Sequence, residues 1–237
     1  MELLADEIEP YYPEVATLLR RRRYVDDFGQ SNEDEETVNR LINETEKSLL
    51  KRDMHIKGWV VSGKPPPTDL SEDGASVPFA GLVWFPEIDC YKLNISSLHF
   101  SKKKRGRLPD NLVKYEGSFG MSIDEFTPEN LTRRMCTSVS ARKFDPLGKA
   151  APLDLRLKND LRKIIHFDSD WDKPIPLELR SRWCENFQIL EDIRDISYVR
   201  CEIPSDALRQ TVRLWLQCDG AEDGNNLLEI SINKSRH

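Results

Sequence analysis

The chain has 237 residues, of which 38% are hydrophobic and 32% charged, and its formal net charge is −6. This length allows one large or two small domains with a buried core. The acidic balance argues against a wholly basic nucleic-acid binder. Because no apolar run approaches the roughly 20 residues of a bilayer span, and the N-terminus lacks the basic region of a signal peptide, we expect an intracellular protein, cytoplasmic or nuclear.

The cysteines predict neither a disulfide framework nor a zinc site. They are odd in number, widely spaced and never form a C-x-x-C pair: Cys90, Cys136, Cys184, Cys201 and Cys218. We expect reduced thiols.

The N-terminal segment, residues 1–13, is acidic and contains Pro10 and Pro13, which predicts an irregular segment or a frayed helix. Residues 14–20 suit either a short helical turn or a strand that leads into the next segment. The four arginines at 20–23 could contact phosphates, pair with acidic side chains or form a solvated face.

The segment Arg23-Tyr24-Val25-Asp26-Asp27-Phe28 has the pattern of a tight β-hairpin with two carboxylates at its tip. Side chains alternate along a strand, but a turn breaks the alternation, so both aspartates can point toward one cation. Mg²⁺ prefers such oxygen ligands and is typically held by one or two carboxylates plus substrate phosphates. The hairpin therefore predicts half of a two-metal nucleotidyl-transfer site, with Asp26 and Asp27 as catalytic metal ligands. We expect Tyr24 and Phe28 to face the core.

An amphipathic helix is predicted over residues 34–52, with Ser31-Asn32 as the N-cap, and we expect it to pack on the sheet that bears the hairpin. Its apolar stripe is Val38, Leu41, Ile42, Thr45, Leu49 and Leu50. Residues 55–61 form a strand candidate. Residues 63–78 have the composition of a linker. Residues 79–84 and 90–98 are predicted to be paired strands, joined by a turn at 86–89.

Residues 101–107 contain five basic side chains in seven positions: Lys102, Lys103, Lys104, Arg105 and Arg107. This block suits contact with a nucleic-acid backbone, a nuclear import signal or a solvated loop. Residues 108–126 are predicted to be a loop. Helices are expected to start at Thr127, near Ala151-Pro152 and after Pro176, and strands are expected at 197–203, 212–218 and 227–232.

Five passages in order resemble the Pol polyprotein of BEL/Pao-type LTR retrotransposons and cover most of the chain between about Tyr24 and Arg200. They are Tyr24-Val25-Asp26-Asp27, Trp59-Val60-Val61-Ser62, Gly81-Leu82-Val83-Trp84, Phe144-Asp145-Pro146-Leu147-Gly148, and Trp171-Asp172-Lys173-Pro174-Ile175-Pro176 followed by Trp183. The first matches the catalytic motif of reverse transcriptases. The third corresponds to the primer grip, which fixes the primer end near the metals.

The resemblance implies an α+β fold in four parts. Residues 1–63 would be the C-terminal part of a reverse transcriptase palm, and 64–108 a linker with a primer-grip-like hairpin. Residues 109–195 would be a helical thumb or connection, and 196–237 the truncated start of an RNase H-like domain.

The resemblance also implies the site residues. Substrate contacts would be Tyr24, Lys57, Gly81, Leu82 and Trp84, and Asp219 would bind metal after an apolar strand. A solvated lysine, a core tryptophan and an aspartate that ends a strand are the alternatives for Lys57, Trp84 and Asp219. The implied cofactor is Mg²⁺, and the implied partners are an RNA or DNA template–primer, dNTP and the rest of the Pol polyprotein, with no membrane.

Two absences from the sequence limit these expectations. Part of the family is labelled Pao retrotransposon peptidase, but neither Asp-Thr-Gly nor Asp-Ser-Gly occurs, so aspartic peptidase activity is not expected. A palm also needs a third carboxylate from an earlier strand, and only 23 residues precede Tyr24. We therefore expect an internal fragment or decayed copy without polymerase activity alone. The alternative is a non-catalytic nucleic-acid-binding or interaction module derived from a transposon.

Overall fold

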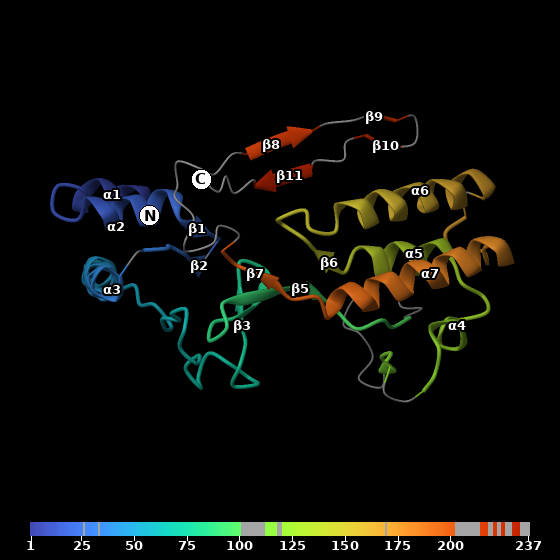
Figure 1. Ribbon diagram of the computed structural model, residues 1–237, viewed down its shortest axis with the longest axis horizontal. Coiled ribbons are helices and arrows are strands. Elements are labelled where there is room, and N and C mark those ends of the chain that lie inside the picture. Colours follow the sequence, from blue (N-terminus) through green and yellow to red (C-terminus); the bar gives the residue numbers. More distant parts are fainter. Residues whose placement is uncertain are drawn as a thin grey trace, which may run out of the picture. The chain divides into compact units, whose positions relative to one another are not determined.

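The computed structural model describes residues 1–25, 27–32, 34–100, 112–117, 120–168 and 170–201, and the backbone of short strands between 214 and 232. The chain divides into two compact units, Met1–Asp89 and Cys90–His237 (Figure 1). Helices and strands occur in both, which confirms the α+β class. None of the helices in the described ranges has the length and apolar character that a bilayer crossing requires.

The first unit contains three helices and two hairpins in its described part. The helices are α1 (Glu2–Ile8), α2 (Pro13–Arg21) and α3 (Glu35–Leu50), and the strands are β1 (Arg23–Tyr24), β2 (Asp27–Phe28), β3 (Val77–Phe79) and β4 (Leu82–Phe85).

The N-terminal segment is a regular helical pair, and the prediction of an irregular or frayed segment at 1–13 is wrong. Pro13 is the first residue of α2, where its missing N–H costs nothing, so the proline separates two helices. Ile8 and Leu19 are completely buried in the core that α1 and α2 share. The helical alternative for residues 14–20 is confirmed.

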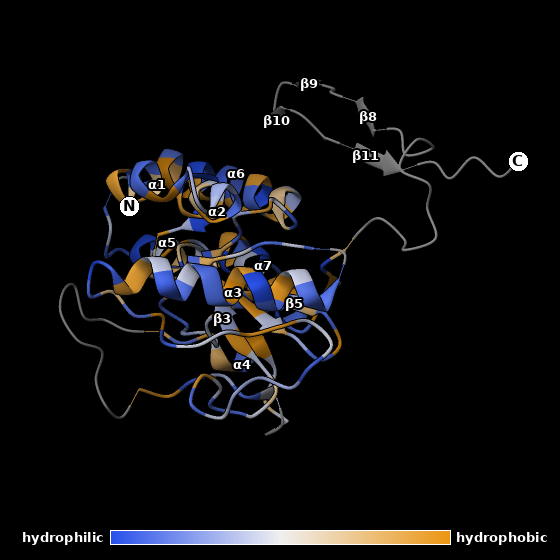
Figure 2. Ribbon diagram, turned by 90° about the vertical axis from the view of Figure 1, so that its left-hand side faces the viewer, coloured by the Kyte–Doolittle hydropathy of each residue, from blue (hydrophilic) through white to orange (hydrophobic). Residues whose placement is uncertain are grey.

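Helix α3 confirms the helix predicted over 34–52, but its cap and its packing differ from the prediction. Asp34, not Ser31-Asn32, is the N-cap, and its Oδ1 accepts a hydrogen bond from Thr37 N at 2.7 Å. Leu41 and Leu49 are buried in the same cluster as the α1 and α2 side chains, so α3 packs on helices and not across the hairpin sheet. Leu50 is 51% exposed, because it lies about 100° around the helix from Leu49. The ribbon of α3 carries both hydrophobic and hydrophilic residues along its length (Figure 2).

No strand forms over residues 55–61, which the sequence predicts to be one. A Cβ on Gly58 would lie 2.6 Å from Leu70 Cδ1, so another segment of the chain approaches this backbone closely. Trp59 donates its indole N–H to Glu46 Oε1 at 2.8 Å. The strand expected after α3 is therefore absent from residues 55–61.

The hairpin β3–β4 turns at Ala80-Gly81, inside the segment 79–84 that was predicted to be one strand. Phe79 pairs with Leu82, which leaves a two-residue loop, and both loop residues have positive φ, 50° for Ala80 and 78° for Gly81. Positive φ at both positions is the mark of a type I′ turn. The turn predicted at 86–89 is present, since Asp89 N donates to Pro86 O at 3.2 Å.

The second unit contains four described helices and several short strands. The helices are α4 (Ile123–Phe126), α5 (Arg133–Ser140), α6 (Ala151–Phe167) and α7 (Leu177–Arg194), and the strands are β5 (Cys90–Ile95), β6 (Lys143–Phe144), β7 (Tyr198–Val199), β8 (Leu214–Gln217), β9 (Gly220–Ala221), β10 (Gly224–Asn225) and β11 (Glu229–Ile232).

The helix predicted to start at Thr127 starts instead at Arg133, as α5. The loop predicted over 108–126 is confirmed for the described residues before Ile123 and is wrong over Ile123–Phe126, which form α4. Ser122 and Glu125 form a capping box that starts α4, and Thr132 caps α5. Between them Leu131 O accepts a hydrogen bond from Ile175 N at 2.9 Å, which holds this backbone outside a helix. The predicted starts of α6 and α7 are confirmed.

Helices α5, α6 and α7 share one core, in which Trp183 and Phe187 are completely buried. Strand β5 pairs antiparallel with β6 and with β7, through Asn94 opposite Phe144 and Tyr91 opposite Tyr198. Strands β8 and β11 pair antiparallel, as do β9 and β10. The predicted strands at 90–98, 197–203, 212–218 and 227–232 thus correspond to β5, β7, β8 and β11.

Candidate functional site

The predicted hairpin at 23–28 is present. Tyr24 pairs with Asp27, and Val25 in the connecting turn has φ 54°, which suits a two-residue hairpin loop. Asp26 lies outside the described residues. Phe28 packs against the helical core, as predicted, but Tyr24 is 44% exposed and does not face the core.

The hairpin β1–β2 contacts the turn of the hairpin β3–β4. Asp27 Oδ2 accepts a hydrogen bond from Ala80 N at 2.7 Å, across 53 residues of sequence. A Cβ on Gly29 would lie 2.5 Å from the Phe79 ring, so only glycine allows this close approach. The contact brings together Asp27, predicted to be catalytic, and Gly81, predicted to bind substrate, since Gly81 follows Ala80 in the turn.

The other predicted substrate contacts divide between surface and interior. Lys57 is exposed, whereas Leu82 is only 8% exposed and is part of the interior. Trp84 is half-buried: its indole N–H donates to Asp89 Oδ1 at 3.2 Å, and its ring lies 6.0 Å from that of Phe79. These contacts give Trp84 a structural role, and its contact with substrate stays a prediction.

The described residues do not by themselves form a divalent-cation site. Two Mg²⁺ ions need several carboxylates from separate strands. Within the described ranges no three His, Cys, Asp or Glu side chains gather where they could hold a metal ion. Asp27 supplies one carboxylate, and one of its oxygens already accepts the Ala80 N–H. Asp219, like Asp26, is outside the described residues.

The basic block Lys102, Lys103, Lys104, Arg105 and Arg107 also lies outside the described residues, but the residues that flank it are well anchored. Leu98 N donates to Glu191 Oε1 at 2.9 Å, and Tyr115 N donates to Leu98 O at 2.7 Å. Burial raises the pKa of Glu191.

A buried carboxylate, Asp160, joins α6 to α7. Its side chain is 0% exposed and accepts hydrogen bonds from Asn186 Nδ2 at 2.9 Å, Arg182 Nε at 2.5 Å and Lys163 Nζ at 3.2 Å. Burial alone would raise the pKa of Asp160, but these three donors outweigh it and hold the pKa below its ordinary value. The sequence offered a signal for this group, because Asp160 continues the helical spacing of Leu153 and Leu157 into the core.

Two of the passages that carry the family resemblance have structural roles here. The Asp145 side chain is almost completely buried and accepts hydrogen bonds from Lys149 N and Ala150 N at 3.0 and 2.7 Å, which fixes the turn before α6. In the other passage, Trp171 stacks under the Arg133 guanidinium at 3.9 Å, and Asp172 binds Arg134 through both oxygens. These contacts hold the segment before α7 against the start of α5.

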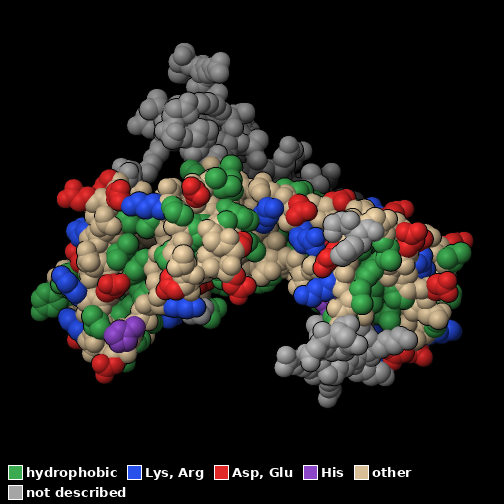
Figure 3. All heavy atoms as spheres, turned by 90° about the horizontal axis from the view of Figure 1, so that it is seen from below, with side chains coloured by type: hydrophobic (Ala, Val, Ile, Leu, Met, Phe, Trp, Pro, Cys, Tyr) green, Lys and Arg blue, Asp and Glu red, His purple; other side chains and the backbone are tan. Residues whose placement is uncertain are grey.

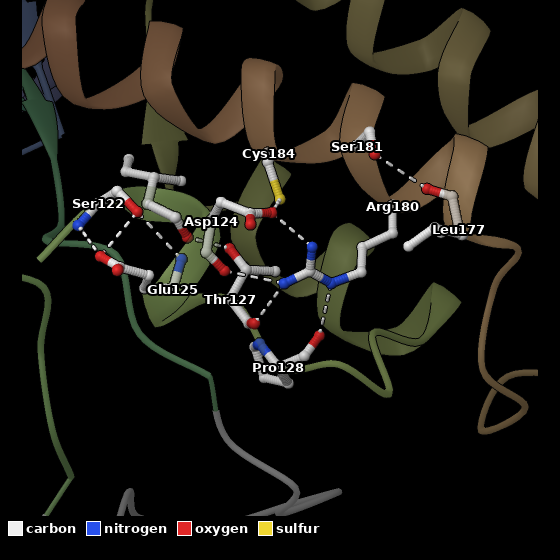
Figure 4. Close-up of polar contacts among 10 residues, drawn as sticks. Ser122, Asp124, Glu125, Thr127, Pro128, Leu177, Arg180, Ser181 and Cys184 are labelled. Atoms are coloured by element: carbon white, nitrogen blue, oxygen red, sulfur yellow. Dashed lines mark hydrogen bonds and ion pairs between the residues drawn. The ribbon is translucent and has the colours of Figure 1, made fainter.

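Arg180 binds the segment that links α4 to α5 (Figure 4). Its guanidinium donates to Asp124 Oδ1 at 2.5 Å and to the carbonyl oxygens of Asp124, Thr127 and Pro128 at 2.8, 2.7 and 3.2 Å. The Arg180 contact lowers the pKa of Asp124, while burial raises the pKa of Cys184 beside it. A shallow groove of about 450 Å³ adjoins this network and is lined by Ser122, Ile123, Asp124, Arg156, Cys184, Glu185, Gln188 and Ile189.

Comparison with known families gives a match to part of the chain. Residues 132–226 match the family model described as Pao retrotransposon-like RNaseH-like domain. The match begins at the N-cap of α5 and extends through α6, α7 and β7 to β10, so it includes helices for which the sequence resemblance implied a thumb. The match supports the expectation that the chain is a fragment of the Pol polyprotein of a Pao retrotransposon. No curated protein and no solved structure matches the chain.

Proposed function

We propose that this chain is a segment of a Pao-type retrotransposon Pol polyprotein whose first unit contributes the metal-binding hairpin of a reverse transcriptase palm. The observation that carries the proposal is the hydrogen bond between Asp27 Oδ2 and Ala80 N at 2.7 Å. It joins the Tyr24-Val25-Asp26-Asp27 hairpin to the turn that begins the primer-grip-like passage. A polymerase needs these two features together, because the primer end must lie beside the catalytic carboxylates.

The proposed chemistry is nucleotidyl transfer in a site that this chain only partly supplies. Bound Mg²⁺ would lower the pKa of the primer hydroxyl and neutralise charge on the dNTP phosphates. Asp26 and Asp27 would act as two of its ligands, and a third carboxylate would come from another strand. Asp219 would be a metal ligand of the RNase H-like part. We propose that the chain alone does not polymerise.

A second candidate is a nucleic-acid-binding or interaction module without chemistry. The observation that favours it is that Asp27 already has a structural role as the acceptor for Ala80 N, and that the described residues gather no set of three metal-ligating side chains.

Primer extension on an RNA template with Mg²⁺ tests the proposal and separates the two candidates. The chain alone should incorporate no more dNTP than the Asp26→Ala, Asp27→Ala double variant. Added to a fragment that supplies fingers and the first catalytic strand of a Pao-type polymerase, the chain should support incorporation and the double variant should not. Equal incorporation by the two proteins in that second assay would favour the module without chemistry.

A further inference from the structure

The four consecutive arginines before the hairpin have two different environments. Arg20 lies against α1, where its guanidinium contacts Asp6 at 2.5 Å, Glu9 at 3.0 Å and Glu2 at 3.7 Å. Arg21, Arg22 and Arg23 are exposed and form no ion pair with any residue in the described part of the chain. The acidic side chains on and just after α1 therefore neutralise Arg20. They leave Arg21, Arg22 and Arg23 without an ion-pair partner in the described part of the chain.

This arrangement contrasts with arginines elsewhere in the described helices, many of which contact carboxylates. Examples are Arg40 with Glu14 at 2.6 Å, Arg134 with Asp172 at 2.7 Å and Arg156 with Glu185 at 2.7 Å. On the face seen in Figure 3, basic and acidic side chains are interspersed. Three adjacent guanidinium groups that form no ion pair within the described ranges repel one another, which favours binding of an external anion.

Favourable interaction with the C-terminal end of α2 accounts for only some of the arginines at 20–23. A cation in the last turn of a helix interacts favourably with the helix dipole, which applies to Arg21 at the end of α2. Arg22 follows the helix and Arg23 lies in β1, and the dipole effect falls off beyond the last turn.

An exposed aromatic ring and a polar hollow adjoin the arginines. Tyr24, the next residue, is 44% exposed. Arg22 also lines a hollow of about 250 Å³ together with Pro13, Glu14, Thr17 and Gln30. The acidic member of this lining, Glu14, is held by Arg40 at 2.6 Å, so its charge is partly compensated.

We propose that Arg21, Arg22, Arg23 and Tyr24 form a surface that binds a single-stranded nucleic acid, with the guanidinium groups on phosphates and the tyrosine ring stacked on a base. Unpaired cations beside an exposed aromatic ring are the combination that single-strand binding uses. The surface ends at the β1–β2 hairpin that carries Asp27. A bound nucleic-acid single strand would therefore be directed toward this hairpin. The inference rests on the proposed function for the choice of nucleic acid as partner.

Fluorescence anisotropy with a labelled 12-nucleotide single strand in EDTA tests the surface over a range of salt concentrations. Changing Arg21, Arg22 and Arg23 to Gln should reduce the slope of log K against log salt by about 2, because each single-strand phosphate contact contributes roughly 0.7. The matched control carries Lys47→Gln, Lys51→Gln and Arg52→Gln, the same charge change on and just after α3, and should leave the slope unchanged. An unchanged slope in the first variant, or an equal loss in both, would overturn the proposal.

The role of Tyr24 has its own local readout. Tyr24→Ala should weaken binding at least about fivefold, the lower limit for a stacked base, while Tyr24→Phe retains it. A strand that carries 5-iodouracil should crosslink more to Tyr24 than to Tyr11, although Tyr11 is 74% exposed. Crosslinking that follows exposure alone would contradict a specific surface.

These measurements stay separate from the test of nucleotidyl transfer, because EDTA removes the metal and no catalysis is required. Loss of binding in the arginine variant supports the surface even if primer extension fails. A polyphosphate chain of matched charge that binds as tightly as the single strand would overturn the assignment to nucleic acid.

Discussion

Asp27 and Ala80 lie 53 residues apart in sequence, yet the carboxylate of one accepts the backbone N–H of the other at 2.7 Å. The contact fixes the hairpin that carries the predicted metal ligands to the turn in which the predicted primer grip begins. Because the donor is a backbone group in a turn with positive φ, the contact depends on both hairpins having their observed geometry.

Removing the Asp27 carboxylate should destabilise the first unit. A hydrogen bond to a charged group contributes about 1.5–3 kcal/mol, so Asp27→Ala should lower the free energy of unfolding by roughly that amount. Asp27→Asn keeps an oxygen acceptor and should cost less. Urea unfolding of the two variants measures the difference, and an equal loss in both would argue against this hydrogen bond as the cause.

Leu41 and Leu50 both belong to the predicted apolar stripe of α3, but only Leu41 is buried, at 5% exposure against 51% for Leu50. Leu41→Ala should therefore cost about 2–5 kcal/mol, the range for a leucine removed from a core. Leu50→Ala should change the free energy of unfolding by less than about 0.5 kcal/mol. Comparable losses in urea unfolding would contradict the packing of α3 on α1 and α2.

Asp160 should make the second unit sensitive to acid. The pKa of Asp160 is lowered in the folded state. Its contribution to the free energy of unfolding is therefore complete above the ordinary aspartate pKa of about 4 and is lost as the pH falls through the lowered pKa. Asp160→Ala should cost roughly 3–5 kcal/mol near pH 7, because Asn186 and the cations lose their buried acceptor.

The pH dependence of Asp160→Asn separates its charge from its shape. The wild-type protein should be more stable than this variant near pH 7. The difference should shrink as the pH falls from about 4 through the lowered pKa, because Asp160 takes up a proton more readily in the unfolded chain than in the folded protein. Thermal unfolding at several pH values measures it. A difference that stays constant with pH would mean that the charge of Asp160 does not contribute.

The basic block should carry salt-dependent, sequence-independent binding. Neutralising Lys102, Lys103, Lys104, Arg105 and Arg107 should reduce the slope of log K against log salt by several units on duplex DNA, since each phosphate contact contributes roughly one. Anisotropy with two duplexes of unrelated sequence measures both properties. An unchanged slope would assign the block to a solvated loop.

Local signals predicted part of this fold well. Proline at helix starts and regular apolar spacing predicted α6 and α7, and the Tyr24–Asp27 pattern predicted a hairpin. Contacts between distant segments explain errors in the predicted helix boundaries. The backbone hydrogen bond from Ile175 N to Leu131 O interrupts the helix expected after Thr127. The regular helix α1 was missed because the prolines were taken as signs of irregular structure, although Pro13 is the first residue of α2.

For the candidate sites, too, local sequence patterns predicted some features, while others depend on contacts between distant segments. Composition and motif pointed to the hairpin and its neighbouring arginines. Of the four arginines at 20–23, Arg20 pairs with acidic side chains of the α1 segment through tertiary contacts that no local pattern encodes. Asp160 and Arg180 could have been found from sequence, since each is a charged residue at a core position of a helical stripe. Their partners lie on other elements and could not.

The most direct test of the proposed palm hairpin is a Mn²⁺ titration followed by NMR, with Mn²⁺ as the paramagnetic substitute for Mg²⁺. We predict selective broadening of the backbone amides of residues 24–28, lost in the Asp26→Asn, Asp27→Asn variant and retained in a Glu35→Gln, Glu36→Gln control on the first turn of α3. Broadening spread over the acidic surface, or unchanged in the aspartate variant, would contradict a metal-binding role for this hairpin.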